Sequence, residues 1–298
     1  MRFLAVGNPA SSGFTDEVRA MVERELSSAG SVRWFIPSDD STDDELRAAA
    51  RDSDVVVVAG GDGTFNHTVN ALEDRLDGVS FGLVPVGTGN DFARTAGLPE
   101  DPAEAARVAV AANVREIDVA RASGPGVSRL FVNACMGGFP VQVNEAIDED
   151  TKARLGPLAF WVGGAKAAAG IERSTITMNG VEVPDCVAAG VGNGRTCGGG
   201  IMVWPEADPS DGVLDGCALG AGGVTAAVRL LLKVRAGDHS ELEAVRTTRG
   251  GRIEIDADPP IELNVDGELV GLTTPATFEV CGRLRLAVPG NAPVTSPE

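Results

Sequence analysis

Residues 54–64 read DVVVVAGGDGT, an apolar run that ends in a glycine-rich turn. A short apolar run bounded by turn residues is typical of a fully buried strand. Residues 64–76 then carry four apolar side chains on one stripe at helical spacing: Phe65, Val69, Leu72 and Leu76. The stretch therefore predicts a buried strand, a tight turn and a helix.

A second turn of the same kind, PVGTGND at residues 85–91, follows the next predicted strand, residues 79–84. A turn between a strand and a helix leaves backbone N–H groups that point at one spot near the positive end of the helix dipole, which suits phosphate. Asp62 and Asp91 lie inside the two turns. Because a carboxylate repels a phosphate unless a cation or a hydroxyl lies between them, the pair of turns indicates a nucleotide bound with Mg²⁺.

Residues 1–121 alternate strand and helix signals, which predicts an α/β domain with a parallel sheet. Thr42 and Glu45 have the spacing of a capping box at the start of a helix. The expected strands are residues 3–6, 32–36, 54–59 and 79–84, and the expected helices are residues 15–29, 42–50, 64–76 and 102–112.

Residues 122–298 differ in character, because short runs of alternating apolar and polar residues replace the strand–helix pattern. Asn179-Gly180, between residues 174–178 and 181–183, is a hairpin signal. We therefore expect a mainly antiparallel β-sandwich as the second domain, with a disordered, proline-rich tail at residues 289–298. Further strands are expected at residues 252–256, 261–265, 277–280 and 283–288, and helices at residues 152–170 and 224–236.

The net charge, the cysteine pattern and the length of the apolar runs indicate which partners the protein can bind and in which compartment it lies. The 298 residues carry a net charge of −18, which argues against nucleic-acid binding and against strong attraction to an anionic membrane unless basic residues cluster locally. The five cysteines are scattered without a C-x-x-C pattern, as is typical of reduced thiols. No signal-peptide pattern and no run of about 18 apolar residues occurs. We expect a cytoplasmic protein, with peripheral contact at a membrane left open.

Several catalytic classes lack their residues in this chain. A serine or cysteine triad needs a histidine, and only His67 and His239 are present, with no G-x-S-x-G motif. The absence of a P-loop motif and of G-x-G-x-x-G after the first strand argues against P-loop NTPases and weakens the case for a dinucleotide. His67 is either a polar residue on the first turns of a helix or a ligand contact, and the sequence leaves both open.

Six motifs occur in order: NPASSG at residues 8–13, GGDGTFN at 60–66, PVGTGNDFAR at 85–94, GNG at 192–194, PEADPSDG at 205–212 and DGE at 266–268. In this combination the sequence resembles the bacterial diacylglycerol-kinase-like lipid kinases, which are similar to sphingosine and ceramide kinases. The resemblance extends from residue 3 to residue 288. It implies an α/β domain like those of NAD kinase and diacylglycerol kinase, followed by a β-rich lipid-substrate domain.

The resemblance implies that ATP binds between the two domains. Glycines that let the backbone approach phosphates, and threonines that supply hydroxyl donors, agree with this role. The turn at residues 11–13 is also compatible with an ordinary loop between a strand and a helix. The residues implied around the nucleotide are Asn8, Pro9, Ala10, Ser11, Ser12, Gly13, Ser38, Gly60, Gly61, Asp62, Gly63, Thr64, Asn66, Thr88 and Arg94.

The resemblance also implies catalytic roles for three carboxylates. Glu268 would be the general base that takes the proton from a lipid hydroxyl, and Asp62 and Asp91 would hold a network of Mg²⁺ and water on the phosphates. From the residues alone, the favoured interpretation of Glu268 is simply a charged residue after a hairpin turn. Asp118 either joins this network or lies on the solvent face of a strand.

A Mg²⁺ site is implied at Asp211, with help from Asp208 and from the carbonyl of Val213, because this hard ion prefers oxygen ligands. The acidic turn that holds these residues is otherwise a solvated surface loop. Two features depart from the family pattern. His67 stands where a glutamate is usual, and the turn at residues 8–13 is one residue longer than the common form.

The sequence therefore predicts a Mg²⁺- and ATP-dependent kinase that phosphorylates a hydroxyl of diacylglycerol or a similar lipid. The alternatives are an NAD-kinase-like enzyme, against which GNDFAR at residues 89–94 argues, and a nucleotide-binding regulator without catalysis. The expected partners are the lipid and a membrane surface that is contacted transiently, with a homodimer left open. The apolar segment 155–162 is either an interfacial helix or a helix packed on the sandwich.

Overall fold

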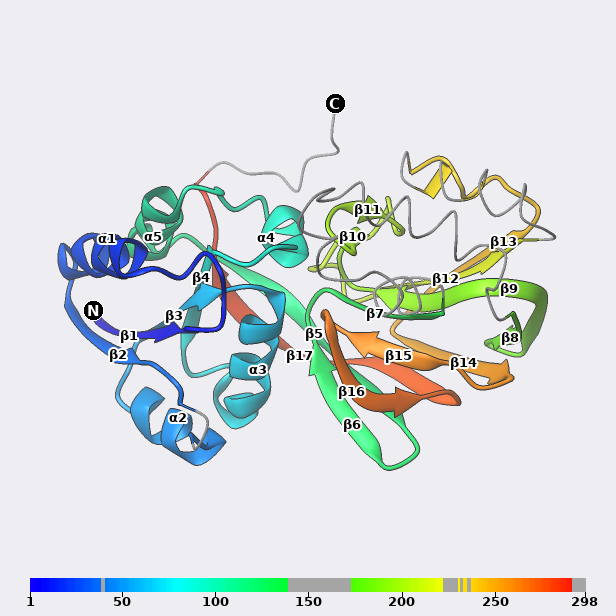
Figure 1. The fold of residues 1–298 in the computed structure, drawn as a ribbon, viewed down its shortest axis with the longest axis horizontal. Coiled ribbons are helices and arrows are strands. Elements are labelled where there is room, and N and C mark those ends of the chain that lie inside the picture. Colours follow the sequence, from blue (N-terminus) through cyan, green and yellow to red (C-terminus); the bar gives the residue numbers. More distant parts are fainter. Residues whose placement is uncertain (39–40, 139–172, 222–229, 231–232, 235–236, 291–298) are drawn as a thin grey trace. The chain divides into compact units, whose positions relative to one another are not determined.

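The computed structural model describes residues 1–38, 41–138, 173–221, 230, 233–234 and 237–290 (Figure 1). The helix expected at 152–170 with its apolar segment, most of the helix expected at 224–236 and most of the expected disordered tail lie outside these residues. None of the described helices has the length and apolar character needed to cross a bilayer.

The chain divides into two compact units, Met1–Val119 together with the segment that begins at Cys281, and Ala120–Val280. The chain passes between the units within β5 (Val114–Gly124) and within β17 (Ala276–Ala287). The segment after Cys281 therefore belongs to the first unit, whereas the change in sequence pattern alone divides the chain once, near residue 121.

The first unit is an α/β domain with a parallel sheet, as expected. Its strand order is β17-β4-β3-β1-β2, and every neighbouring pair in that order is parallel. All six residues of β3 are buried, because helices cover both faces of a parallel sheet. The remaining bounds are β1 (Arg2–Gly7), β2 (Ser31–Phe35), β3 (Val55–Gly60) and β4 (Ser80–Pro85).

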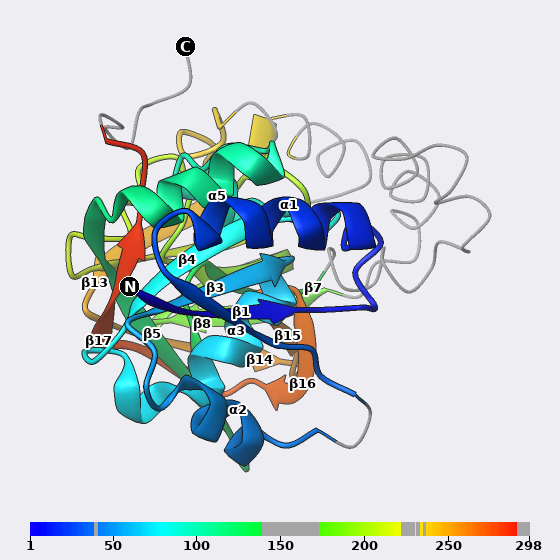
Figure 2. The same ribbon diagram turned by 90° about the vertical axis from the view of Figure 1, so that its left-hand side faces the viewer.

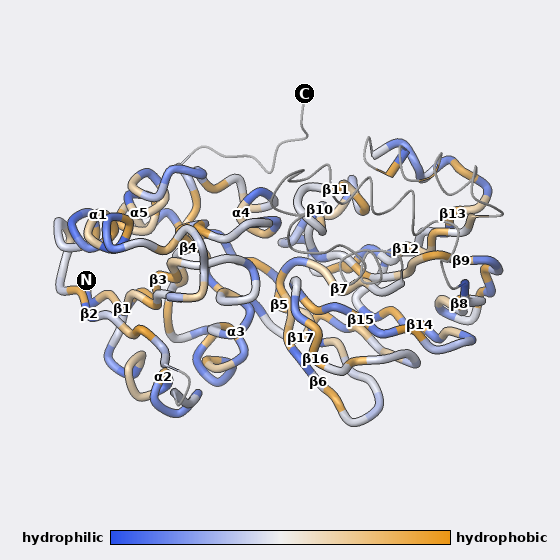
Figure 3. Tube along the Cα trace, viewed as in Figure 1, coloured by the Kyte–Doolittle hydropathy of each residue, from blue (hydrophilic) through white to orange (hydrophobic). Residues whose placement is uncertain are grey.

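Helices pack on both faces of this sheet. Figure 2 shows α1 (Asp16–Ser27) and α5 (Pro102–Ala111) on one face and α2 (Asp43–Ala50) and α3 (Asp62–Ala71) on the other. Hydrophobic residues concentrate on the strands, whereas the exposed helices carry many hydrophilic ones (Figure 3). The remaining helix, α4 (Asp91–Thr95), follows β4.

The predicted local signals are present in α2 and α3, with one difference. The Thr42 side chain accepts from the backbone N–H of Glu45, and the Glu45 side chain accepts from that of Thr42, which confirms the capping box. The helix expected to run to residue 76 ends at Ala71, and Glu73–Arg75 form a 3-10 turn. Near this end the side-chain amide of Asn70 donates to the carbonyl of Asn66, a contact that competes with helical bonding.

The strand order creates a switch point in the first sheet. From β1 the chain goes to β2 on one side, and β3 then lies on the other side of β1. In open α/β sheets, ligands bind outside the carboxyl ends of the strands at such a point. The carboxyl ends of β1 and β3 are Gly7 and Gly60, and each is followed by one of the motifs quoted above.

The second unit is β-sandwich-like and mainly antiparallel. Its path runs β16-β15-β7-β9-β8-β14-β17, and β12 pairs with both β9 and β13. The left-handed residues Asn179 and Gly180, at φ of 49° and 79°, confirm the expected hairpin between β8 and β9. The bounds are β6 (Val127–Phe131), β7 (Ala134–Gly138), β8 (Ser174–Met178), β9 (Val181–Gly192), β10 (Thr196–Cys197), β11 (Ile201–Met202), β12 (Leu214–Gly220), β13 (Val245–Gly250), β14 (Arg252–Asp258), β15 (Glu262–Val265) and β16 (Glu268–Thr273).

One strand assignment from the sequence is wrong. The runs expected at 277–280 and 283–288 are parts of the single strand β17. The apparent break arises because β17 changes partners, pairing with β14 at residues 276–279 and with β4 at residues 285–286. Its alternation of buried and exposed residues slips between these two stretches.

Candidate active site

The two glycine-rich turns of the first unit lie directly against one another. A Cβ added at Gly87 would lie 2.5 Å from the Cα of Gly61, and one added at Gly61 would lie 3.1 Å from the Cα of Gly87. The backbone N–H of Val86 also donates to the carbonyl of Gly60. This close approach of two backbones requires glycine at residue 87 and leaves little room for a side chain at residue 61.

Asp62 joins the two turns through its carboxylate. Its Oδ2 accepts from the backbone N–H of Asp91 at 2.9 Å, and its Oδ1 accepts from that of Phe92 at 3.0 Å. The Asp91 carboxylate is buried and lies 2.9 Å from Nη1 of Arg94, whose Nη2 donates to the carbonyl of Gly89. The first carboxylate therefore organises the second turn, and the second carboxylate has an arginine as counter-ion.

The turn after β1 contacts both glycine-rich turns. The side-chain amide of Asn8 donates to Oγ1 of Thr64 at 2.9 Å, and Oγ of Ser11 donates to the carbonyl of Val86 at 2.8 Å. A Cβ added at Gly13 would clash with that same carbonyl. We call residues 8–13, 60–64 and 85–91 the turn cluster. The structure brings its members together at the switch point of the sheet.

The other predicted nucleotide residues differ in exposure. Pro9, Ala10, Ser12 and Thr88 are exposed, so Ser12 is the serine of the longer first turn whose side chain faces solvent. Asn66 is buried, and its side-chain oxygen accepts from Nδ2 of Asn70. Gly60 and Gly63 have no side chain and can offer a ligand only their backbone groups. A Cβ added at Gly60 would lie 2.6 Å from the Cβ of Thr64.

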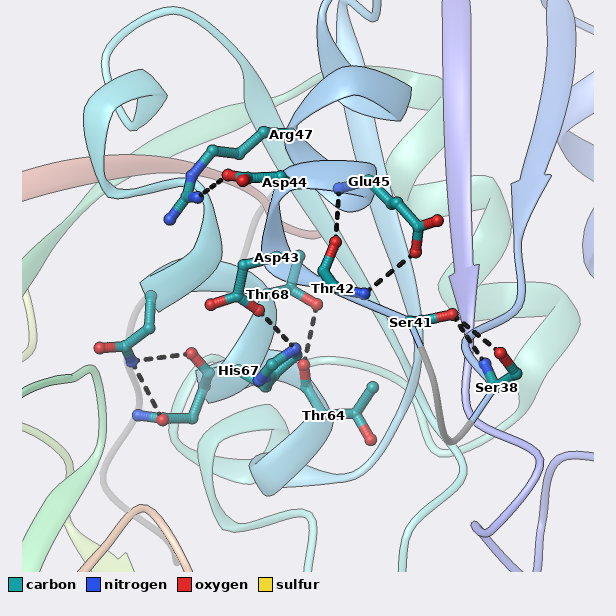
Figure 4. A network of polar contacts seen from close by, with 12 residues as sticks. Ser38, Ser41, Thr42, Asp43, Asp44, Glu45, Arg47, Thr64, His67 and Thr68 are labelled. Atoms are coloured by element: carbon teal, nitrogen blue, oxygen red, sulfur yellow. Dashed lines mark hydrogen bonds and ion pairs between the residues drawn. The ribbon is translucent and has the colours of Figure 1, made fainter.

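Ser38 and His67 belong to a polar network around the start of α2 (Figure 4). Oγ of Ser41 accepts from the backbone N–H of Ser38 at 2.9 Å. Nε2 of His67 lies 3.2 Å from Oδ1 of Asp43, and both side chains are largely exposed. His67 therefore connects α3 to the first turn of α2.

The acidic turn of the second unit is folded by its own carboxylates. Oδ1 of Asp208 accepts from the backbone N–H of Ser210 at 3.1 Å and from its hydroxyl at 2.7 Å. Oδ1 of Asp211 accepts from the backbone N–H of Val213 at 3.0 Å. The other oxygen of Asp211 lies 2.6 Å from Nη2 of Arg249.

Arg249 connects this turn to a buried carboxylate. Its Nε lies 3.0 Å from Oδ1 of Asp215, which is 8% exposed. Burial raises the pKa of Asp215 to about 6, although the guanidinium acts in the opposite direction. Sequence reasoning missed both residues, because nothing near either of them in the chain marks them as partners.

The donor set of this turn suits a hard cation such as Mg²⁺. Asp211 offers a partly exposed carboxylate oxygen that already has a cationic partner, the guanidinium, and Val213 offers a carbonyl. The described residues contain no group of three or more His, Cys, Asp or Glu side chains arranged around a metal position. A cation here would therefore rely on one carboxylate with backbone carbonyl oxygens and water.

Glu268 is the exposed first residue of β16, directly after a hydrogen-bonded turn. Asp266 and Gly267 have φ of 46° and 95°, and Oδ1 of Asn264 accepts from the backbone N–H of Gly267 at 2.7 Å. The turn therefore presents the Glu268 carboxylate to solvent from a defined backbone position.

Asp266, the first residue of the DGE motif, anchors this turn, a role that the sequence did not reveal. Its buried carboxylate accepts from the backbone N–H groups of Val132, Asn133 and Ala134 at 2.8, 3.0 and 2.8 Å. The GNG motif binds the same segment, because Nδ2 of Asn193 donates to the carbonyl of Val132 at 2.7 Å. The only signal in the sequence was the Asp-Gly pair itself.

Asp118 does not lie on a solvent-exposed strand face, so that alternative is wrong. Its side chain is fully buried and lies 2.9 Å from Nε of Arg283. Arg283 also lies 3.1 Å from Glu116. This pairing connects β5 to the segment of β17 that belongs to the first unit.

Comparisons with known proteins agree with this architecture. Residues 2–122 match the diacylglycerol kinase catalytic domain, and residues 133–288 match the YegS C-terminal NAD kinase beta sandwich-like domain. A probable lipid kinase YegS-like of Stenotrophomonas maltophilia is 34% identical over 98% of both chains, and one of Pseudomonas putida is 31% identical over 98% of this chain and 92% of its own.

A solved structure of a diacylglycerol kinase from Bacillus anthracis has a TM-score of 0.77 and 25% identity, with 97% of each chain covered. The family expected from the motifs is thereby confirmed, and so is the expected fold class. The chain belongs to the diacylglycerol-kinase-like family of lipid kinases.

Proposed function

We propose that this lipid kinase transfers the γ-phosphate of ATP, in a Mg²⁺-dependent reaction, to a hydroxyl of diacylglycerol or a similar lipid. The observation that carries the proposal is the turn cluster, in which three turns meet at the switch point of a parallel sheet. Backbone N–H groups in such turns and the dipoles of the following helices favour the anionic triphosphate.

The residues of the turn cluster would bind the nucleotide. Thr64 and Thr88 would offer hydroxyl donors, and the glycines would let the backbone approach the phosphates. Arg94 would neutralise part of the phosphate charge. Its contact with Asp91 would hold the guanidinium in position for this role. Asp62 and Asp91 would hold the network of Mg²⁺ and water on the phosphates. Ser38 and Asn66 would complete the nucleotide contacts.

Glu268 would act as the general base. Its carboxylate would accept the proton of the lipid hydroxyl while the hydroxyl oxygen attacks the γ-phosphorus, and the bond to the β-phosphate oxygen would break to release ADP. Phosphoryl transfer needs mainly positioning and charge neutralisation, so one well-oriented carboxylate is sufficient. The exposed position of Glu268 after a hydrogen-bonded turn supports this role.

Asp208, Asp211 and Val213 would hold a Mg²⁺ ion, which would supply charge neutralisation in the acidic turn when bound. The lipid acceptor would be reached by transient contact with a membrane surface. Whether two copies of this chain form a homodimer is left open, as in the sequence analysis.

The transfer of labelled phosphate from ATP to lipids in mixed vesicles tests the proposal, with Glu268→Gln and Glu262→Gln as a pair. Both are exposed glutamates at the first position of a strand in the same hairpin. We expect Glu268→Gln to lose most of the transfer, by a factor of about 100 or more, and Glu262→Gln to keep it. Near-normal transfer by the first variant would remove the base assignment. Phosphorylation of NAD instead of any lipid, or ATP binding without transfer, would contradict the proposal that a lipid accepts the phosphate.

A further inference from the structure

Arg249 forms a bridge between two carboxylates that differ in their surroundings. Asp211 lies in the exposed turn, with 30% of its side chain accessible, whereas the Asp215 side chain is 12% accessible. The guanidinium reaches Asp211 through Nη2 at 2.6 Å and Asp215 through Nε at 3.0 Å. One positive charge therefore serves two negative charges.

The contact between Arg249 and Asp215 is the more firmly held of the two. The residues are direct cross-strand partners in the β12–β13 pairing, so the backbone register places them side by side. The second oxygen of Asp215 is buried without a hydrogen-bond partner among the described residues. Loss of the guanidinium would leave that buried carboxylate without a counter-ion, which is strongly unfavourable.

The contact with Asp211 is easier to release. Half of the Arg249 side chain is exposed, and water can replace the guanidinium at an exposed carboxylate oxygen. Asp211 is also the side chain through which the proposed Mg²⁺ would bind. The Asp211 carboxylate can thus bind either of two cations, the guanidinium of Arg249 or a divalent ion from solution.

We propose that Arg249 is an internal counter-ion that competes with the divalent cation for Asp211 and thereby weakens cation binding in the turn at residues 208–213. This inference rests on the proposed metal site. Because Arg249 stays at Asp215, its positive charge remains next to a cation bound at Asp211, and the two repel each other. The arginine also offsets part of the negative charge of the turn when no divalent ion is bound.

The opposite role for Arg249 makes the opposite prediction. If the guanidinium served mainly to orient Asp211 as a ligand, its removal would weaken cation binding. The sign of the change in affinity therefore separates a competing cation from a positioning residue.

Calorimetric titration of the full chain with MnCl₂ and with MgCl₂ tests the proposal without using the kinase reaction. We expect Arg249→Gln to bind either ion about five- to tenfold more tightly than the wild type. Arg246→Gln is the matched control, because it removes the same charge from an exposed position on the same strand, and it should bind as the wild type does. Asp211→Asn should lose the binding.

A second variant covers the risk that Arg249→Gln unfolds. Asp215→Asn combined with Arg249→Gln removes the buried charge together with its partner, and it should also bind the ions more tightly than Asp215→Asn alone. Unchanged or weaker binding in the folded Arg249 variants would overturn the proposal. If Asp211→Asn bound the ions as tightly as the wild type, the cation would not bind at Asp211, and the proposal would be overturned as well. The lipid transfer assay tests the kinase function independently.

Discussion

At the scale of single residues, the partly buried carboxylate of Asp62 and the buried carboxylate of Asp266 hold backbone segments that are distant in the chain. Asp62 accepts from N–H groups 29 and 30 residues away, and Asp266 accepts from N–H groups more than 130 residues away. Hydrogen bonds to a charged acceptor are stronger than those to a neutral one. Each of these residues therefore acts as a cross-link between a motif and another part of its own unit.

Replacement of Asp266 by Asn should disturb the turn that carries Glu268. The side chain of Asn has one acceptor oxygen in place of two, so at least one of the three N–H groups loses its partner. We expect a loss of about 1–3 kcal/mol in the free energy of unfolding and a lower kcat with little change in the KM for ATP. Urea denaturation and steady-state kinetics measure both, with Glu262→Gln as the control. A wild-type kcat in Asp266→Asn would contradict the anchoring role.

His239 should make the stability of the second unit depend on pH. Its side chain is fully buried, its Nε2 lies 2.9 Å from the carbonyl of Val203, and burial lowers its pKa below 6.5. The unfolded chain therefore binds more protons than the folded one as pH falls below about 6.5, and stability is lost there, by at most about 1.4 kcal/mol per pH unit.

Urea denaturation of the wild type and of His239→Gln between pH 7.5 and pH 5 measures this effect. We expect the difference in unfolding free energy between them to shrink as the pH falls. A constant difference across the range would exclude the assignment to His239.

At the scale of elements, the contact between two turns depends on the absence of side chains. β3 and β4 are neighbouring parallel strands, so their carboxyl ends bring the two turns together, and Gly61 and Gly87 then meet backbone to backbone. The Asp62 carboxylate completes the contact by binding the first amides of α4. The geometry of the turn cluster is thus a property of paired strands and not of either motif alone.

Replacement of Gly87 by Ala should separate the turns. The added Cβ would lie 2.5 Å from the Cα of Gly61, and backbone cannot move aside as a flexible side chain can. We expect a loss of about 1–3 kcal/mol in stability and weaker ATP binding, measured by urea denaturation and by calorimetry. Gly78→Ala is the control, since its Cβ would approach nothing closer than 3.5 Å. If Gly87→Ala bound ATP as tightly as the wild type, the contact between the two turns would not be needed for nucleotide binding.

At the scale of the whole molecule, the last strand contributes to both units. β17 pairs with β14 in the second unit and with β4 in the first, so the first sheet is completed by residues from the end of the chain. Leu284 and Leu286 are fully buried there. The first unit consequently forms all its pairings only after the rest of the chain is present.

Replacement of Leu286 by Ala should therefore destabilise the first unit. We expect a loss of about 2–5 kcal/mol and faster hydrogen exchange in β3 and β4 than in the wild type, with less change in β8. Hydrogen exchange followed by mass spectrometry resolves these strands. Arg285→Ala, at an exposed neighbouring position, should leave the exchange of β4 unchanged. Equal protection of β4 in Leu286→Ala and the wild type would contradict the role of this segment.

The sequence by itself determined the features that depend on neighbours in the chain. The run of valines, the glycines after it, the capping box at Thr42 and the Asn179-Gly180 turn each follow from local periodicity or backbone preference, and each is present in the structure. The family could be predicted as well, because its motifs are contiguous and occur in order. The end of α3 at Ala71 could not be predicted, because no glycine or proline follows it directly. The single strand β17 could not be predicted either, since a change of strand partner divides its pattern.

Only the tertiary structure decided the partners of the charged residues. Asp62 with α4, Asp266 with residues 132–134, Arg249 with two aspartates and Asp118 with Arg283 all join positions far apart in the chain. The physical reason is that a charge removed wholly or partly from water is stabilised by a hydrogen bond or an opposite charge wherever the fold supplies one. No periodicity along the chain records where that partner will be.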